Sequence, residues 1–340
     1  MISSCELDMS FGDPRPGCVV GPVRHYIWVA YRLVVFVRPS IGVLELLGLS
    51  IGLTLLGLRN ICCDGILCLY SHCKGVALWN PATREIKSLP RTTLRHSEFW
   101  ECAFTFTAFG HDPKTDDYKV FRLLTCSNMP GRPIQKMELY TLSSDSWRQM
   151  DLDVPAHIEG TNIINTCMKG INHWLGSDHE NGDVVILLFD TSDEVFGVIP
   201  LPDSFGNQRG DIAVYNEMIA LIFYPNTYTD TDTATEKRFD MWVMSEYGVK
   251  ESWTRLFTIG AVSGVERPSG FWSNGGVFMG SSSGELLLYN HFTQQFKNLG
   301  VFSVARRPSI ERYMQVIIYK ESLVSLNGRH EEEDGIIRVP

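Results

Sequence analysis

The stretch from Leu78 to Pro90, LWNPATREIKSLP, decides how this 340-residue chain folds. A pair of large apolar residues is followed by a polar turn and by a second strand-like run that ends in Leu-Pro. Trp79 and Ile86 stand seven positions apart, which suits two strands joined by a tight turn with both side chains on one face. The stretch therefore predicts a β-hairpin.

Four further segments repeat this pattern, and they begin at Leu139, Leu188, Met241 and Leu288. The steps between successive units are 61, 49, 53 and 47 residues. In the fourth unit the turn SEYGVKES lengthens the aromatic spacing from seven to eleven. The large side chains at the recurring positions are predicted to form the core of the repeats: Trp79, Tyr140, Trp147, Phe189, Phe196, Trp242, Trp253, Tyr289 and Phe296.

Two more strand-like runs precede each hairpin. In the first unit they are residues 60–63 and 66–70, separated by the turn dipeptide Asp64-Gly65. The other units repeat this arrangement, so each has four strands and the period is near 50 residues. Apolar runs such as VVILLF at 184–189 fit sheets that are buried on both faces, which stacking around an axis achieves. The sequence predicts an all-β, kelch-like β-propeller of four-stranded blades.

The two ends of the chain leave the number of blades open between five and six. Five repeats end near Val301, and QVIIYKESLVSL at 315–326 supplies one or two more strands. In a ring, these strands either close a blade that begins near the N-terminus or belong to an incomplete sixth blade. We therefore expect five complete repeats over residues 60–326 with a partial or composite sixth. The charged tail at 327–340 is expected to be disordered.

Residues 1–59 form an atypical, apolar N-terminal segment. The run at 27–58 is long enough for a membrane-spanning helix, but Glu45 and several glycines weaken that interpretation. A packed helical extension and a segment without an evolved fold are the other two interpretations. All three stay open, and a membrane anchor over residues 27–58 is the least favoured.

Composition excludes several functional classes. The net charge of -9 argues against a nucleic-acid partner, because such proteins neutralise phosphates with basic side chains. Nine irregularly spaced cysteines indicate reduced thiols in a cytoplasmic or nuclear protein. Cys62, Cys63, Cys68 and Cys73 with nearby His72 lack the paired spacing of a zinc site. No catalytic or phosphate-binding motif is present, so we expect a non-catalytic protein without metal or cofactor.

Several runs together resemble a known plant family. They include CDGILCLYSHCKGVALWNPATREIKSLP at 63–90, AFGHDPKTDDYKVFRL at 108–123 and MWVMSEYGVKESWTRLFTI at 241–259. These runs resemble the F-box-associated domain of plant F-box proteins, over residues 60–326. The last run, together with VIIYKESLV at 316–324, looks most like the S-locus F-box (S-haplotype-specific F-box) group.

This resemblance implies the substrate-recognition component of a Skp-cullin-F-box ubiquitin ligase. In such proteins the F-box binds the Skp adaptor and the associated domain selects the protein target. For the S-locus group the implied targets are S-ribonucleases, and the implied process is self-incompatibility. Residues 1–59 show no recognisable F-box, so Skp and cullin are expected partners only if an F-box is supplied. An F-box-less interaction scaffold or a degraded family member is the alternative.

The partner-binding surface is predicted on one rim of the propeller. The loops between the second and third strands of each blade share that rim with the long connections between blades, and variable loops on a rigid frame often carry recognition. Acidic loops there would steer a basic protein target. The predicted contact residues are Trp100, Asp178, His179, Glu180, Asp183, Phe205, Tyr228, Asp230, Asp232 and Glu236. The alternative is that these are solvated or tucked loop side chains.

Overall fold

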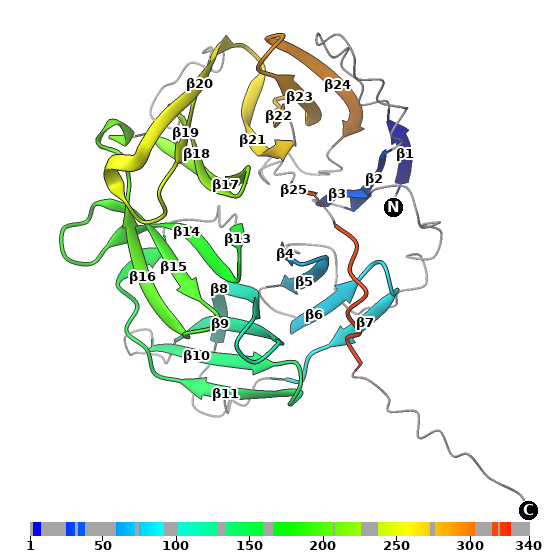
Figure 1. The fold of residues 1–340 in the computed structure, drawn as a ribbon, viewed down its shortest axis with the longest axis vertical. Coiled ribbons are helices and arrows are strands. Elements are labelled where there is room, and N and C mark those ends of the chain that lie inside the picture. The colour runs from blue at the N-terminus through cyan, green and yellow to red at the C-terminus, as the bar shows by residue number, and fades with distance from the viewer. Residues whose placement is uncertain are drawn as a thin grey trace, which may run out of the picture.

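The computed structural model consists almost entirely of β-strands, and Figure 1 shows its sheets arranged as a ring. It describes residues 3–7, 25–30, 33–37, 59–71, 75–91, 101–127, 134–158, 166–206, 208–225, 237–272, 276–302, 315–318 and 320–327. Two short 3-10 helices, Asp203–Phe205 and Lys250–Ser252, are the helical elements among these residues. The prediction of an all-β propeller of four-stranded blades is confirmed.

The first two blades are antiparallel meanders in which each strand pairs with the next one along the chain. Blade 1 comprises β4 (Arg59–Cys63), β5 (Ile66–Ser71), β6 (Gly75–Asn80) and β7 (Glu85–Ser88). Blade 2 comprises β8 (Glu101–Asp112), β9 (Asp117–Ser127), β10 (Ile134–Thr141) and β11 (Ser146–Met150). In both blades the first strand lies nearest the centre of the ring and the fourth lies at its periphery (Figure 1).

Blade 3 has one strand more than predicted. It comprises β12 (Ala156–Ile158), β13 (Thr166–Met168), β14 (Ile171–Asp178), β15 (Val184–Asp190) and β16 (Val195–Pro200). The short strands β12 and β13 pair with opposite ends of β14. The three residues of β12 are too few to show a strand pattern in the sequence.

Blades 4 and 5 complete the five readable repeats. Blade 4 comprises β17 (Arg209–Tyr215), β18 (Met218–Tyr224), β19 (Lys237–Met244) and β20 (Trp253–Val262). Blade 5 comprises β21 (Val265–Trp272), β22 (Gly276–Ser281), β23 (Glu285–Asn290) and β24 (Gln295–Phe302). Both are antiparallel in the same order as blades 1 and 2.

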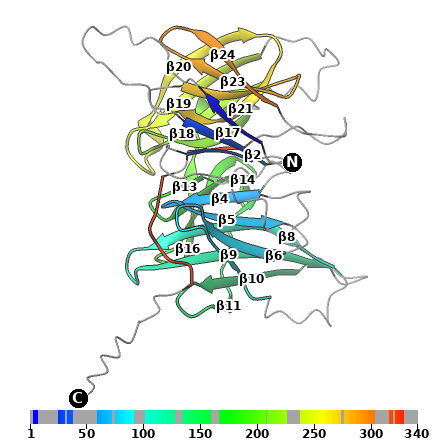
Figure 2. The same cartoon turned by 90° about the vertical axis from the view of Figure 1, so that its right-hand side faces the viewer.

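The sixth sheet is composite, because strands from both ends of the chain build it. It comprises β1 (Ser3–Leu7), β2 (His25–Ala30), β3 (Leu33–Val37) and β25 (Gln315–Ile318). β25 pairs parallel with β3, with Ile317 opposite Val35, whereas the other pairings among the described strands are antiparallel. Of the two ways to use residues 315–326, the structure therefore shows the closing of a blade that begins near the N-terminus. Figure 2 gives the view along the plane of the ring.

The N-terminal strands correct the two helical interpretations of the apolar segment over the residues that they cover. The sequence leaves a helical extension and a helical anchor open for the apolar segment, but residues 25–30 and 33–37 are strands. Their sequences, HYIWVA and LVVFV, are rich in β-branched and aromatic residues, which favour strands. Residues 38–58 and 328–340 lie outside the described residues. Within the described part of the chain, no helix has the length and apolar character needed to cross a bilayer.

The strand registers explain the spacing of seven in the repeated hairpins. Four predicted pairs lie directly opposite each other: Trp79 with Ile86, Tyr140 with Trp147, Phe189 with Phe196, and Tyr289 with Phe296. Blade 4 differs, because Trp242 faces Arg255 and Trp253 faces Met244, with an irregularity in the pairing between Met241 and Trp242. The longer turn of that unit therefore breaks the aromatic pair, although both tryptophans remain in the core.

Apolar side chains fill the seams between neighbouring blades. One cluster joins residues of blades 1 and 2, including Leu78 and Trp147, and a second joins Phe121 and Phe189 of blades 2 and 3. Two further clusters join blade 3 to blade 4 and blade 4 to blade 5. The predicted core residues are buried or half-buried, and all but Trp79 belong to these clusters or pack against them, as sheets covered on both faces require. Phe189, for example, is fully buried.

Buried ion pairs also lie among these apolar seams, and Arg122–Glu138 and Arg267–Asp211 are two of them. Arg122 Nε donates to Glu138 Oε2 at 2.9 Å, and the guanidinium carbon lies 3.7 Å from the ring centre of Trp147. Arg267 of blade 5 donates to Asp211 of blade 4 at 2.9 Å. Because a buried charge is costly without a partner, each pair fixes the position of one strand relative to another.

Candidate binding rims and the polar contacts that hold them

Residues 178–183, between β14 and β15, are a described part of the predicted binding rim. Asp178 Oδ1 accepts hydrogen bonds from the backbone N–H groups of Glu180 at 2.7 Å and Asn181 at 3.4 Å. The backbone N–H of Asp178 donates to the carbonyl of Asp183 at 2.8 Å, which closes the turn. The turn is therefore held by its own hydrogen bonds, and Asp178 acts as a turn former.

The other acidic side chains of this turn face solvent. His179, Glu180 and Asp183 are exposed, whereas Asp178 is half-buried. Within the described ranges, neither Glu180 nor Asp183 forms a salt bridge. The turn thus presents two carboxylates on a fixed backbone, which is a geometry that attracts positive charge.

Phe205 was predicted as an exposed contact residue, and the structure shows this to be wrong. Only 5% of its surface is exposed, and its ring packs edge-on against Phe223 at 4.8 Å. A Cβ added to Gly210 would lie 2.9 Å from the Phe205 ring, so the backbone of β17 comes very close. Burial of the ring among the apolar residues between blades 3 and 4 outweighs its loop position.

The remaining predicted contact residues lie outside the described residues. They are Trp100 in the connection between blades 1 and 2, and Tyr228, Asp230, Asp232 and Glu236 between β18 and β19. Their part in the rim stays a prediction. Of the ten predicted contact residues, the structure thus brings together the four at 178–183.

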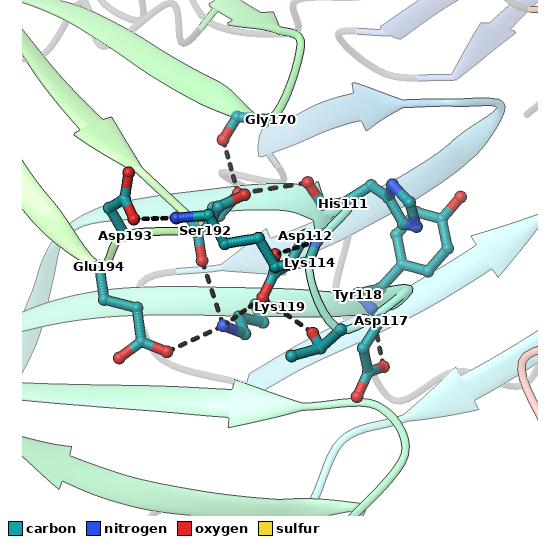
Figure 3. Close-up of polar contacts among 12 residues, drawn as sticks. His111, Asp112, Lys114, Asp117, Tyr118, Lys119, Gly170, Ser192, Asp193 and Glu194 are labelled. Atoms are coloured by element: carbon teal, nitrogen blue, oxygen red, sulfur yellow. Dashed lines mark hydrogen bonds and ion pairs between the residues drawn. The ribbon is translucent and has the colours of Figure 1, made fainter.

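A buried polar network, shown in Figure 3, ties blade 2 to blade 3. Lys119 on β9 reaches Asp112 Oδ2 at 2.7 Å and Glu194 Oε1 at 2.9 Å. Its ammonium group also donates to the carbonyl of Thr191 at 3.3 Å. Lys119 and Asp112 are 6% and 1% exposed, so their charges are almost fully removed from water and depend on these partners.

The partners keep the carboxylates of this network ionised. Burial alone would raise the pKa of Asp112, but hydrogen bonds from Lys119, Thr115 and Lys114 hold it well below its usual range. The same balance lowers the pKa of Glu194, which also accepts from Arg148. A proton-accepting or proton-donating role would need a pKa nearer neutrality. The network therefore ties blade 2 to blade 3.

His173 forms a polar contact between blade 3 and the turn between β19 and β20 of blade 4. Nδ1 lies 3.2 Å from the carbonyl of Thr166 and Nε2 lies 2.7 Å from the hydroxyl of Tyr247. A carbonyl can only accept, so Nδ1 donates to it and Nε2 accepts from Tyr247. Burial lowers the pKa of His173 to about 4. The ring is therefore neutral at physiological pH.

This neutral histidine predicts a pH dependence of stability. An unfolded histidine has a pKa near 6.5, so between about pH 6.5 and 4 the unfolded chain binds the proton that folded His173 does not. Stability is fully present above this window and falls as the pH drops through it, by about 2 kcal/mol at pH 5. Urea unfolding of wild type and His173→Gln at pH 7.5 and 5.0 measures this. Equal losses in both proteins would contradict it.

The opposite rim carries exposed aromatic side chains that sequence reasoning did not select. Among the described residues, Tyr247 is 43% exposed in the turn between β19 and β20, and Phe292 is 70% exposed in the turn between β23 and β24. The ring of His291 stacks on Phe257 with 4.7 Å between centroids. Tyr247 and Phe292 lie in hairpin turns that the repeats define. An aromatic residue in such a turn was therefore the sequence signal that could have identified them as exposed.

The described cysteines do not form a metal site. Burial raises the pKa of Cys62 to about 12 and also raises the pKa of Cys68, which disfavours the thiolate that binds metals. Over the described ranges, no three His, Cys, Asp or Glu side chains are placed to hold a metal ion. Cys73 lies outside those ranges.

The ring of sheets and the loops at its two rims place this molecule in the class of β-propellers. The model of the F-box associated beta propeller domain matches residues 26–326, so the chain belongs to that family. The match begins at Tyr26 in β2, within the atypical N-terminal segment at residues 1–59. It ends at Leu326.

Relatives with curated names support the same family. A putative F-box protein of Arabidopsis thaliana is 29% identical over 201 residues, which are 58% of this chain and 52% of the relative. An F-box/kelch-repeat protein of the same plant is 32% identical over 174 residues, or 47% of this chain and 41% of the relative. The chain thus spans about half the length of the curated relatives it matches.

Solved structures with a similar shape are much more distant. The alpha-L-arabinanase of Penicillium chrysogenum shares 13% identity at a TM-score of 0.44, covering 71% of this chain and 80% of that one. The Dos1 propeller shares 12% identity at a TM-score of 0.37, covering 82% and 67%. At such scores neither likeness says anything of function.

Proposed function

We propose that this chain is the target-binding component of a Skp-cullin-F-box ubiquitin ligase, acting without catalysis of its own in the cytoplasm or nucleus. The observation that carries the proposal is the F-box associated propeller itself, matched over residues 26–326 and closed into a ring. A rigid ring with loops at its rims suits selective protein binding. The names of the relatives, F-box and F-box/kelch-repeat, support the same role.

We infer further that the target is a basic protein of the S-ribonuclease kind. The net charge of -9 and the two exposed carboxylates of the 178–183 turn support a basic partner. The sequence resemblance to the S-locus group supports the choice of ribonuclease.

A second candidate is an interaction scaffold that does not recruit the ligase. Its supporting observation is that residues 3–7, 25–30 and 33–37 are strands of the sixth sheet, so these residues belong to the propeller and do not form a helical adaptor-binding module. Co-precipitation of the full chain with a Skp adaptor and cullin separates the two. A saturable adaptor complex supports the ligase component, and its absence at micromolar adaptor supports the scaffold.

The rim turn predicts a charge-dependent association rate. Neutralising Glu180 and Asp183 together, as Glu180→Gln and Asp183→Asn, is expected to slow association with a basic S-ribonuclease about three- to tenfold at low salt, with little effect on the fold. Surface plasmon resonance at two salt concentrations measures this rate. Because screening removes the steering, the difference should vanish at high salt.

A matched control removes an exposed carboxylate from the other rim. Glu217 is exposed in the turn between β17 and β18 and pairs with Lys169. Glu217→Gln is expected to leave the association rate near that of wild type. If the rim variant and this control associate at the same rate, the 178–183 turn does not steer the target.

A further inference from the structure

The segment after β25, residues 320–327, lies along blade 1 as an extended peptide, without forming a strand (Figure 1). Its side chains alternate: Ser322 and Val324 are half-buried and Leu326 is fully buried, whereas the residues between them are exposed. Leu323, for instance, is 91% exposed. This period of two is that of a bound extended strand with one face turned inward.

Asn80, at the end of β6, binds the backbone of this segment. Its Nδ2 donates to the carbonyl of Ser322 at 3.0 Å and to that of Val324 at 2.7 Å. Its Oδ1 accepts from the backbone N–H of Ala82 at 3.0 Å, which fixes the orientation of the amide. Asn80 is fully buried, so these are the contacts that satisfy its side chain in place of water.

Glu85, at the start of β7, holds the next part of the segment. It accepts from the backbone N–H of Leu326 at 2.9 Å and from the Ser325 hydroxyl at 2.8 Å. The Leu326 side chain enters the apolar cluster between blades 1 and 2, which contains Trp147. One carboxylate, one amide and one apolar site thus recognise an extended chain by its backbone and a single leucine.

The turn between β4 and β5 completes this surface. A Cβ on Gly65 would lie 2.1 Å from the carbonyl oxygen of Lys320 and 2.8 Å from the Cβ of Ser322. The φ of Gly65 is +77°, so the turn itself also favours glycine. The segment therefore approaches the backbone of blade 1 directly, and we name this surface, formed by Gly65, Asn80, Glu85 and the leucine site, the blade-1 slot.

We propose that the blade-1 slot is a binding site for an extended, leucine-anchored peptide segment of a protein partner, and that residues 320–327 occupy it in cis as a competitor. The groups of the segment that the blade-1 slot contacts are two backbone carbonyls, one backbone N–H, one serine hydroxyl and one leucine side chain. A peptide with small or apolar inward positions and a leucine at the Leu326 position presents the same groups. This mode resembles peptide recognition along a sheet, where main-chain contacts give affinity and pockets give selectivity. Peptide binding at the blade-1 slot does not require that the chain recruits a ubiquitin ligase.

A labelled peptide tests the slot on the full chain. The probe is fluorescein-labelled KESAVSLN, the sequence of residues 320–327 with the exposed Leu323 replaced by alanine. Leu326→Asp weakens the cis segment, because a carboxylate is not tolerated in the apolar cluster. Fluorescence polarisation is expected to show at least tenfold tighter binding to Leu326→Asp than to wild type. Adding Asn80→Asp, which removes the two donors, is expected to abolish the gain.

A milder variant and a measurement on wild type distinguish an effect on the slot from unfolding of the protein. Leu326→Ala is the milder variant, for which an intermediate gain is expected, and thermal unfolding verifies each protein. In wild type, excess unlabelled probe is expected to accelerate hydrogen exchange at residues 320–327 and to leave β19 unchanged. A probe with leucine replaced by aspartate at its anchor should have neither effect. Equal binding by wild type and the folded variants, or unchanged exchange in wild type, would overturn the proposal.

Discussion

Replacing Arg122 by methionine is expected to lower the free energy of unfolding by about 3–5 kcal/mol, measured by urea denaturation. Glu138 is completely buried, and Arg122 donates to its Oε2 through Nε. Removing the guanidinium takes the Arg122 hydrogen bonds away from a carboxylate that is buried in the seam beside Trp147. The cost arises from keeping that charge buried after these bonds are lost, more than from the lost attraction.

The double variant Arg122→Met with Glu138→Leu separates these contributions. Because both charges are then absent, we expect most of the stability to return, to within about 1–2 kcal/mol of wild type. Lys169→Met is the matched surface control, since the Lys169–Glu217 pair is 70% and 81% exposed, and it should cost less than about 1 kcal/mol. Similar losses for Arg122→Met and Lys169→Met would contradict the burial of the first pair.

Truncating Trp147 to alanine is expected to cost about 3–5 kcal/mol in the same assay. The side chain is 6% exposed, packs on Tyr140 with 5.3 Å between centroids, and lies under the Arg122 guanidinium. Its Nε1 also donates to the carbonyl of Pro90 at 2.8 Å, which ties blade 2 to the segment leaving blade 1. The variant therefore loses apolar contacts, a hydrogen bond and a cation–π contact together.

Trp147→Phe separates these contributions by keeping most of the apolar ring and losing the donor. A cost of about 1–2 kcal/mol is expected, because the carbonyl of Pro90 loses its partner. The alanine variant should thus be clearly the less stable of the two. If Trp147→Ala costs under about 1 kcal/mol, the seam between blades 1 and 2 does not have the packing described here.

The hairpins of the propeller could be read from the sequence because their information is local. A spacing of seven between Tyr140 and Trp147 places the two side chains opposite each other across one short turn. The same holds for Phe189 and Phe196. Blade 4 departs from this rule because its long turn shifts the register, so Trp253 faces Met244. A change in turn length is visible in a sequence, but the register it produces is not.

Long-range contacts account for what the sequence did not reveal. The pairing of β25 with β3 joins residues 282 positions apart, such as Gln315 and Leu33, so β25 meets its partner strand only when the ring closes. Asn80 shapes its own turn by accepting from the backbone N–H of Ala82, but its contacts with residues 322 and 324 follow from ring closure. Phe205 failed as a rim residue because a neighbouring blade covers it.

Native-state hydrogen exchange of the sixth sheet tests the closed ring most directly. If the ends of the chain meet as the structure shows, the amides of β25 that bond to β3 are protected, with opening free energies within about 2 kcal/mol of those in β18 and β22. Exchange of the β25 amides at the rate of an unstructured peptide, while β18 and β22 stay protected, would contradict the ring closed by both ends of the chain.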